Sequence, residues 1–141
     1  MKLGHVAIYV KDIEKSGAFY KNYFGGITEY ESSHGRQKTL FLSFGKDTTA
    51  LEIMQRTGIP DNPILPGGEQ MGCTHLAFDI GSTKELLELT ERLRQDGYTI
   101  AVEPTDYGTK DFFESCVLDP DGIRVEIGVP KEILHRERGE E

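Results

Sequence analysis

One pattern of segments occurs twice along the chain, and this duplication limits its possible folds more than any other feature. Each copy opens with a short apolar run typical of a strand, continues with a stretch typical of a helix, and ends with three further strand candidates. The opening strands are predicted at residues 5–10 and 73–80. Two βαβββ modules in succession predict an α+β architecture.

Turn and cap residues set the boundaries of the other predicted segments. Asp12 can cap a helix over 13–24 that the Gly25-Gly26 pair ends, and Ser82 can begin a helix over 83–96 that Gly97 ends. The Asp119-Pro120-Asp121-Gly122 sequence predicts a hairpin turn. The remaining strands are predicted at 27–32, 39–44, 49–54, 99–103, 112–118 and 123–129.

The length of 141 residues is ordinary for one domain with a real core. We therefore predict a single domain over 1–129, made of module one (1–55), a proline- and glycine-containing linker (56–72) and module two (73–129). The charged tail, 130–141, is interpreted as a frayed helix or a disordered end.

Composition and charge exclude several classes of partner. A formal net charge of −8 repels phosphate backbones, which argues against nucleic acid. No run of 18 apolar residues is present, so no membrane span is predicted, and the N-terminus leads directly into a strand without a signal peptide. The two cysteines lack CxxC spacing, which favours free thiols and a cytoplasmic location.

Four residues with metal-ligand chemistry occupy matching places in the two modules. His5 and His75 lie at the start of strands, and Glu52 and Glu126 lie in the last strand of each module. Side chains alternate between the faces of a strand, and in all four strands the bulky aliphatic residues share the face opposite the His or Glu. Any one of them alone is more often a solvated or hydrogen-bonded residue, but the recurrence favours a shared role.

Two imidazoles and two carboxylates form a nitrogen–oxygen donor set. Such a set suits one divalent cation per site, with Zn²⁺, Ni²⁺, Co²⁺, Mn²⁺ and Fe²⁺ all compatible. A cation would also offset the cost of placing carboxylates beside apolar strand residues. The residues alone do not choose among these metals.

The motifs GHVAIYVKDIEKSGAFYKNYFGG, THLAFDI and VLDPDGIRVEI resemble the vicinal oxygen chelate superfamily, and within it the glyoxalase I-like (lactoylglutathione lyase-like) proteins. The resemblance extends from His5 to Val129. It implies a cupped eight-stranded mixed sheet, the glyoxalase/bleomycin resistance/dioxygenase fold. It also implies that the metal ligands are His5, Glu52, His75 and Glu126.

By the same resemblance, we expect a metal-dependent lyase or isomerase that acts on a 2-oxoaldehyde–thiol adduct or a similar small molecule with neighbouring oxygens. Glu126 is the expected catalytic base, and Glu52 does the matching work on the opposite side. A low-molecular-weight thiol is the expected co-substrate, and a homodimer the expected assembly. Glutathione-using relatives usually carry Arg and Asn where this chain has Tyr9 and Arg56, so the thiol need not be glutathione.

Other functions within the superfamily remain open. An epimerase or a thiol-transfer resistance enzyme would use the same cup, although thiol-transfer relatives typically use three protein ligands. An extradiol dioxygenase needs two His and one Glu, and the fourth ligand would crowd its oxygen site. A non-catalytic, drug-sequestering protein would be expected to have lost ligands that this chain keeps.

Overall fold

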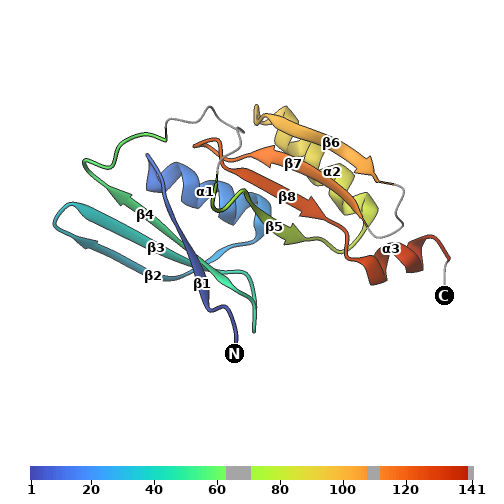
Figure 1. The fold of residues 1–141 in the computed structure, drawn as a ribbon, viewed down its shortest axis with the longest axis horizontal. Helices are drawn as coiled ribbons and strands as arrows, with labels where there is room; N and C mark the ends of the chain where they lie inside the picture. The colour runs from blue at the N-terminus through green and yellow to red at the C-terminus, as the bar shows by residue number, and fades with distance from the viewer. Residues whose placement is uncertain (63–70, 108–111, 140–141) are drawn as a thin grey trace. The chain divides into compact units, whose positions relative to one another are not determined.

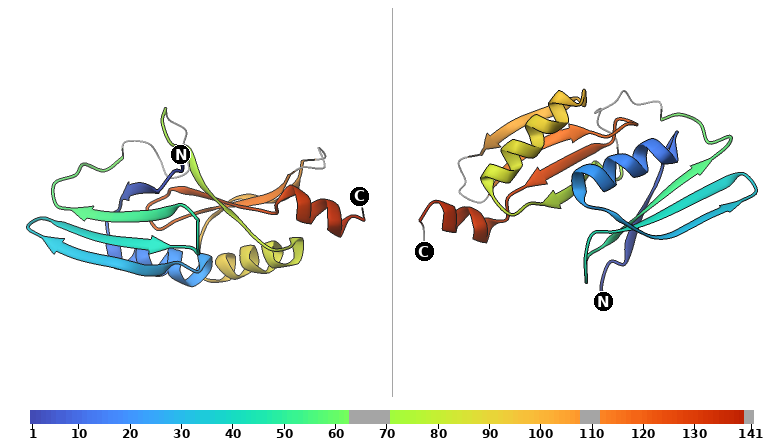
Figure 2. Two further views of the ribbon diagram at one scale, coloured as in Figure 1. Left: turned by 90° about the horizontal axis from the view of Figure 1, so that it is seen from below. Right: turned by 180° about the vertical axis from the view of Figure 1, so that it is seen from behind.

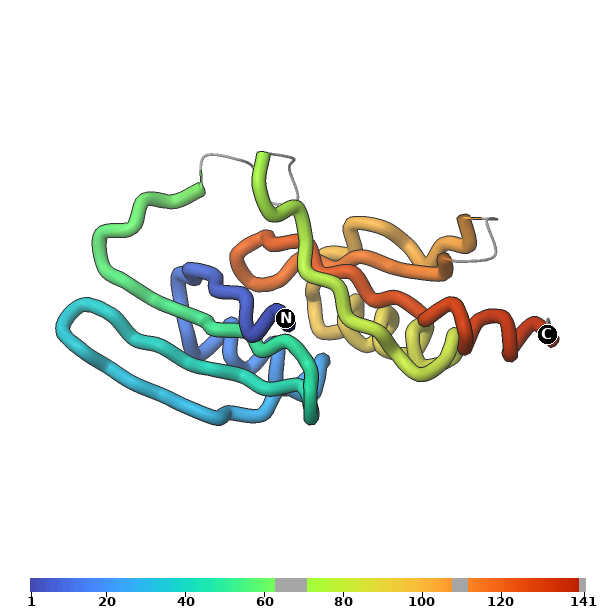
Figure 3. Tube along the Cα trace, turned by 60° about the horizontal axis from the view of Figure 1, so that its bottom comes forward, coloured from blue at the N-terminus to red at the C-terminus, as the bar shows by residue number. Residues whose placement is uncertain are grey.

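The computed structural model describes residues 1–62, 71–107 and 112–139, and its chain divides into two compact units, Met1–Pro63 and Ile64–Glu141. Each unit follows the order strand, helix, three strands, which can be traced from blue to green and again from yellow-green to red in Figure 3. The predicted α+β class and the two βαβββ modules are confirmed.

Unit 1 is a four-stranded sheet with one helix (Figure 1). The strand order is β1-β4-β3-β2, in which β1 pairs with β4 in parallel and the other neighbours are antiparallel. The elements are β1 (His5–Tyr9), α1 (Ile13–Phe24), β2 (Ile27–His34), β3 (Gln37–Ser43) and β4 (Ala50–Arg56).

The bounds of α1 are those predicted from its cap residues. The Asp12 side chain accepts hydrogen bonds from the backbone N–H groups of Glu14 and Lys15, at 3.0 and 3.1 Å. Gly25 ends the helix with φ of 71°, a left-handed conformation that glycine adopts without a steric cost. The helix packs against β3 and β4, where Phe19 and Tyr20 are fully buried.

Unit 2 repeats this arrangement and adds a C-terminal helix. Its strand order is β5-β8-β7-β6, with β5 and β8 parallel and the other neighbours antiparallel. The elements are β5 (His75–Asp79), α2 (Thr83–Gln95), β6 (Ile100–Asp106), β7 (Phe113–Leu118), β8 (Arg124–Gly128) and α3 (Lys131–Glu137). Figure 2 shows these elements from two further directions.

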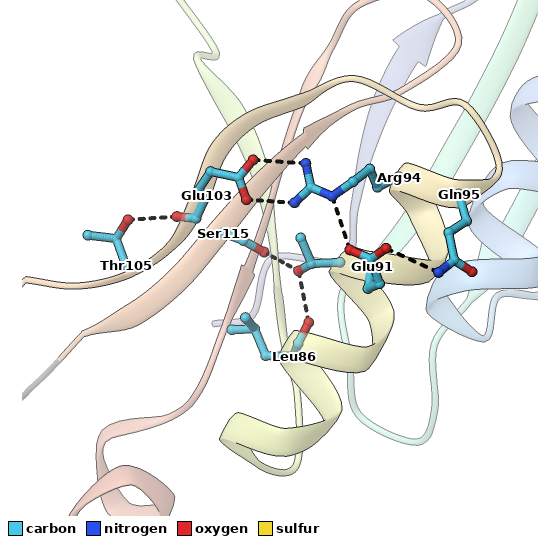
Figure 4. A network of polar contacts seen from close by, with 8 residues as sticks. Leu86, Glu91, Arg94, Gln95, Glu103, Thr105 and Ser115 are labelled. Carbon is cyan, nitrogen blue, oxygen red and sulfur yellow. Dashed lines mark hydrogen bonds and ion pairs between the residues drawn. The ribbon is translucent and has the colours of Figure 1, made fainter.

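Polar contacts attach α2 to β6 and β7 (Figure 4). Arg94 donates to both carboxylate oxygens of Glu103 at 2.9 and 2.6 Å, and also to Glu91 at 3.1 Å. In the core, the Thr90 hydroxyl lies 2.7 Å from the Ser115 hydroxyl and donates to the Leu86 carbonyl at 2.8 Å. The buried side chains Leu86 and Leu93 therefore hold α2 on the sheet together with hydrogen bonds to β6 and β7.

The C-terminal tail forms a helix, one of the two states expected for it. Leu134 is buried, and the Glu137 carboxylate accepts hydrogen bonds from the backbone N–H and the hydroxyl of Thr83 at the start of α2. Arg138 donates to Asp106 at 2.6 Å. Since these contacts are tertiary, the local sequence of the tail does not contain the signal that decides between helix and disorder.

The other strand predictions lie close to the observed bounds, and the eight strands form two sheets of four. Residues 63–70 of the predicted linker lie outside the described residues, and the proposed division into one domain with a linker stays a prediction. Among the described residues, no helix is both long and apolar enough to cross a bilayer.

Candidate metal centre

In unit 1, the parallel pairing of β1 with β4 brings His5 beside Glu52. The strand register places Ala50 opposite His5 and Glu52 opposite Ala7, so the two functional side chains are diagonal neighbours on one face. Their Nε2 and Oε2 atoms lie 3.6 Å apart. The alternate residues of β4, Leu51 and Ile53, are buried, as the predicted division between faces requires.

Unit 2 repeats this geometry with His75 and Glu126. Arg124 lies opposite His75 and Glu126 lies opposite Ala77 in the parallel pairing of β5 with β8. The Nε2 and Oε2 atoms of His75 and Glu126 lie 3.1 Å apart. Val125 and Ile127 are buried on the other face.

Both separations suit two ligands of one cation. Nitrogen and oxygen ligands ~2.1 Å from a common ion, at angles of ~90–120°, lie ~3.0–3.6 Å apart. The distances of 3.1 and 3.6 Å fall in this range. The carboxylates of Glu52 and Glu126 are 25% and 24% exposed, so both are partly withdrawn from water while remaining accessible. The donor set and its spacing therefore fit a divalent metal.

Each unit supplies two of the four candidate ligands. Among the described residues, no three or more His, Cys, Asp or Glu side chains come together in an arrangement that could hold a metal ion.

An aromatic ring and a thioether lie near the His5–Glu52 pair. The His5 ring makes an edge contact with Phe41, with centroids 5.5 Å apart, and Phe41 lies opposite Glu52 in the register of β3 with β4. Met54 lies between Tyr9 and Thr39 in the next row of the sheet.

The surroundings of the His75–Glu126 pair are polar. The Thr74 hydroxyl lies 2.8 Å from Nδ1 of His75. Partial burial raises the pKa of Glu114 above its ordinary value, the negative charge of Glu126 raises it further, and His75 lowers it. Glu114 lies opposite Gly128, two residues along β8 from Glu126, which places it on the same face.

A buried thiol also lies beside Glu126. Cys116 is opposite Glu126 in the register of β7 with β8, and burial raises the pKa of its thiol, while the neighbouring Arg124 guanidinium lowers it. Cys73 is exposed, and its sulfur lies 3.5 Å from the His75 carbonyl oxygen. Both cysteines are free thiols.

Sequence reasoning did not find Thr74 or Glu114. Thr74 directly precedes His75, but the contact of its hydroxyl with Nδ1 of His75 depends on the side-chain rotamers. Glu114 could have been placed by extending the alternation of faces to β7, since Glu114 and Cys116 share one parity. That step requires the β7–β8 register, which the sequence alone does not determine.

A family profile matches most of the chain. Residues 2–127 match the profile of the Glyoxalase/Bleomycin resistance protein/Dioxygenase superfamily. The chain belongs to this superfamily. The resemblance inferred from its motifs is thereby confirmed.

Relatives in the superfamily span nearly the full length of the chain. A lactoylglutathione lyase of Salmonella typhimurium is 26% identical over 131 residues, which cover 90% of this chain and 91% of the relative. The uncharacterized protein YqjT of Bacillus subtilis is 30% identical over 135 residues, covering 89% and 97%. The trypanothione-dependent glyoxalase I of Leishmania major has the same fold, with a TM-score of 0.74, 22% identity, and coverage of 99% and 94%.

Proposed function

We propose that this protein is a divalent-metal-dependent lyase or isomerase of glyoxalase I type, which converts a 2-oxoaldehyde–thiol adduct or a similar small molecule with neighbouring oxygens. The observation that carries the proposal is the repeated His–Glu pair, with nitrogen–oxygen distances of 3.6 and 3.1 Å on the face opposite the core. The similarity to a lactoylglutathione lyase supports the same reaction class.

Four side chains would hold the metal: His5, Glu52, His75 and Glu126. A divalent cation bound there would supply Lewis-acid stabilisation of the negative charge that develops on the substrate oxygens. The imidazoles would each offer a nitrogen lone pair, and the partly buried carboxylates would balance the charge of the cation. The ligand set is compatible with Zn²⁺, Ni²⁺, Co²⁺, Mn²⁺ and Fe²⁺.

Glu126 is the proposed base. One of its carboxylate oxygens would accept the carbon-bound proton of the substrate and return it to the neighbouring carbon, which completes an isomerisation with no net loss of protons. Its position on β8 is fixed on both sides, by β5 and by β7. Glu52 has the corresponding place in unit 1, and we assign it the matching proton transfer on the opposite side.

The thiol of the proposed adduct need not be glutathione. Tyr9 ends β1 and is 43% exposed, and Arg56 ends β4 in an exposed position, where the resemblance implies Arg and Asn in glutathione-using relatives. Arg124, on the face of Glu126, is a cationic group that an anionic substrate would meet.

The proposal includes a cytoplasmic homodimer, in which a site draws its two pairs from one chain or from two. Light scattering after size-exclusion chromatography measures the assembly directly. Mixing His5→Ala with Glu126→Gln chains tests shared sites, because a site built from two chains regains a full ligand set in some mixed dimers.

The decisive experiment combines elemental analysis with an activity assay on wild type, Glu52→Gln and Glu126→Gln. Wild type is expected to carry divalent metal and to convert at least one thiol adduct of methylglyoxal. Glu126→Gln should lower kcat by ~10²–10⁴-fold, the usual contribution of a general base. Glu52→Gln should retain less metal per chain than wild type.

Glu31→Gln is the matched control, since it removes one carboxylate from an exposed position of β2. Metal content and kcat should equal those of wild type. Metal-replete wild type that converts no 2-oxoaldehyde–thiol adduct would reject the proposal. Metal-free protein that binds a small molecule tightly would instead favour a sequestering role.

A further inference from the structure

Both ring nitrogens of His75 have polar partners. Nε2 lies 3.1 Å from Oε2 of Glu126, and Nδ1 lies 2.8 Å from Oγ1 of Thr74. His5 differs, because Gly4 stands in the place of Thr74 and the contacts of its ring in the described residues are with Phe41 and Glu52. The His75 ring is therefore oriented by polar contacts at both nitrogens, whereas the His5 ring has such a contact at Nε2 alone among the described residues.

The hydroxyl of Thr74 can serve either protonation pattern of a neutral imidazole. An ionised Glu126 only accepts hydrogen bonds, so its Oε2, 3.1 Å from Nε2, favours the tautomer with the proton on Nε2, in which Nδ1 accepts from the Thr74 O–H. When Nε2 offers its lone pair to a cation, the single imidazole proton resides on Nδ1 and the hydroxyl accepts from it. A carbonyl at this place would serve the second pattern alone.

We propose that Thr74 is a positioning residue that holds the His75 ring in both states and changes from donor to acceptor when Nε2 binds a divalent cation. The inference rests on the proposed metal site. In this change the imidazole proton moves from Nε2 to Nδ1, where the Thr74 hydroxyl accepts it. Thr74 touches neither substrate nor metal and acts through His75.

Three variants isolate the hydroxyl. Thr74→Val keeps the β-branched shape that suits the start of a strand and removes the hydroxyl. Thr74→Ser restores the hydroxyl without the methyl group. Thr49→Val is the matched control, because the exposed Thr49 hydroxyl donates to the Leu3 carbonyl at 3.1 Å, in unit 1.

The first readout is the nitrogen chemical shifts of the His75 ring in chelator-treated protein at ~pH 8, above the ordinary titration range of imidazole. Wild type, Thr74→Ser and Thr49→Val should show the tautomer with the proton on Nε2. Thr74→Val should show a mixture of tautomers, because Nδ1 has lost its donor. A merely structural role for Thr74 would not change this signature.

The second readout is the Zn²⁺ dissociation constant, measured by competition with a chromophoric chelator. Thr74→Val should bind ~10-fold more weakly than wild type, at the low end of the ~10–100-fold known for outer-sphere partners, because water can partly replace an exposed hydroxyl. Thr74→Ser and Thr49→Val should bind within a few-fold of wild type.

Three different results would count against the inference. If wild type binds Zn²⁺ and Thr74→Val matches it in affinity and in tautomer, the inference is overturned while the proposed function stands. If wild type binds no divalent cation, the proposed function fails and the inference fails with it. If Thr74→Ser binds Zn²⁺ as weakly as Thr74→Val, the inference is also overturned, since the shape of the side chain and not its hydroxyl would then be responsible.

Discussion

Among single residues, Glu114 carries an electrostatic cost next to the candidate site. Its pKa is raised, chiefly by partial burial and then by the charge of Glu126, so the folded state binds the Glu114 proton more tightly than the unfolded state. Such a group favours folding fully below its unfolded pKa, and that contribution is lost as pH rises through the folded pKa. Ionised Glu114 therefore destabilises the metal-free protein at neutral pH.

The corresponding prediction is that Glu114→Gln stabilises the chelator-treated protein at ~pH 8 and that this advantage shrinks toward ~pH 4, the ordinary range of a glutamate. Urea denaturation at several pH values measures the difference. Glu31→Gln removes one negative charge from a chain of net charge −8 and controls for general repulsion. An advantage that stays constant with pH would contradict the linkage.

The same residues show how far single positions can be predicted from sequence. The alternation of faces was enough to place His5, Glu52, His75 and Glu126 opposite the aliphatic core, because that core fixes the side on which each strand is buried. Glu114 and Thr74 were missed because their contacts depend on strand register and rotamer. Whether the four candidate ligands bind metal stays a prediction.

At the scale of elements, the turn between β7 and β8 fixes the register that places Glu126. Asp119 is buried, and its Oδ1 accepts hydrogen bonds from the backbone N–H groups of Asp121 and Ile123, both at 2.9 Å. The Gly122 N–H donates to the Asp119 carbonyl at 3.0 Å, closing the turn. The Asp119 carboxylate therefore supplies an acceptor for two backbone N–H groups of the turn.

We predict that Asp119→Ala lowers the unfolding free energy by ~1–3 kcal/mol, because two donors lose their acceptor. Asp119→Asn keeps a carbonyl oxygen in the same place and should lose less. Urea denaturation of the two variants beside wild type measures the order. Equal losses would show that the charge of Asp119, and not its acceptor geometry, stabilises the turn.

The bounds of an element were predicted better where residues next to it in sequence set them than where contacts with distant segments do. The start and end of α1 follow from Asp12 and Gly25, which act on the backbone beside them. The predicted β6 was shorter than the observed Ile100–Asp106, and its pairing with β7 contains register shifts that no local pattern shows. The helical state of α3 depends on Leu134, Glu137 and Arg138 and on partners far away in sequence.

For the whole molecule, duplication has a thermodynamic consequence under the proposed function. Each unit contributes one His–Glu pair, and an ion bound by both pairs would be held more tightly than an ion bound by one, because four donors take the place of two. The sequence predicted the two modules and their equivalent pairs. How the pairs combine could not be predicted from it, because this depends on the assembly and not on local patterning.

The combination of the pairs can be measured through stability. A cation that binds only the folded state, at ~100 times its dissociation constant, stabilises the protein by ~2.7 kcal/mol. If one ion needs both pairs, Glu52→Gln and Glu126→Gln should each abolish most of the Zn²⁺-induced stabilisation, and the double variant should lose no more than either. If each pair binds its own ion, each variant should lose about half and the double variant the sum. Thermal unfolding of all four proteins with and without Zn²⁺ distinguishes these cases, with Glu31→Gln expected to respond as wild type does. Additive losses would reject a shared centre, because a single ion can be lost only once.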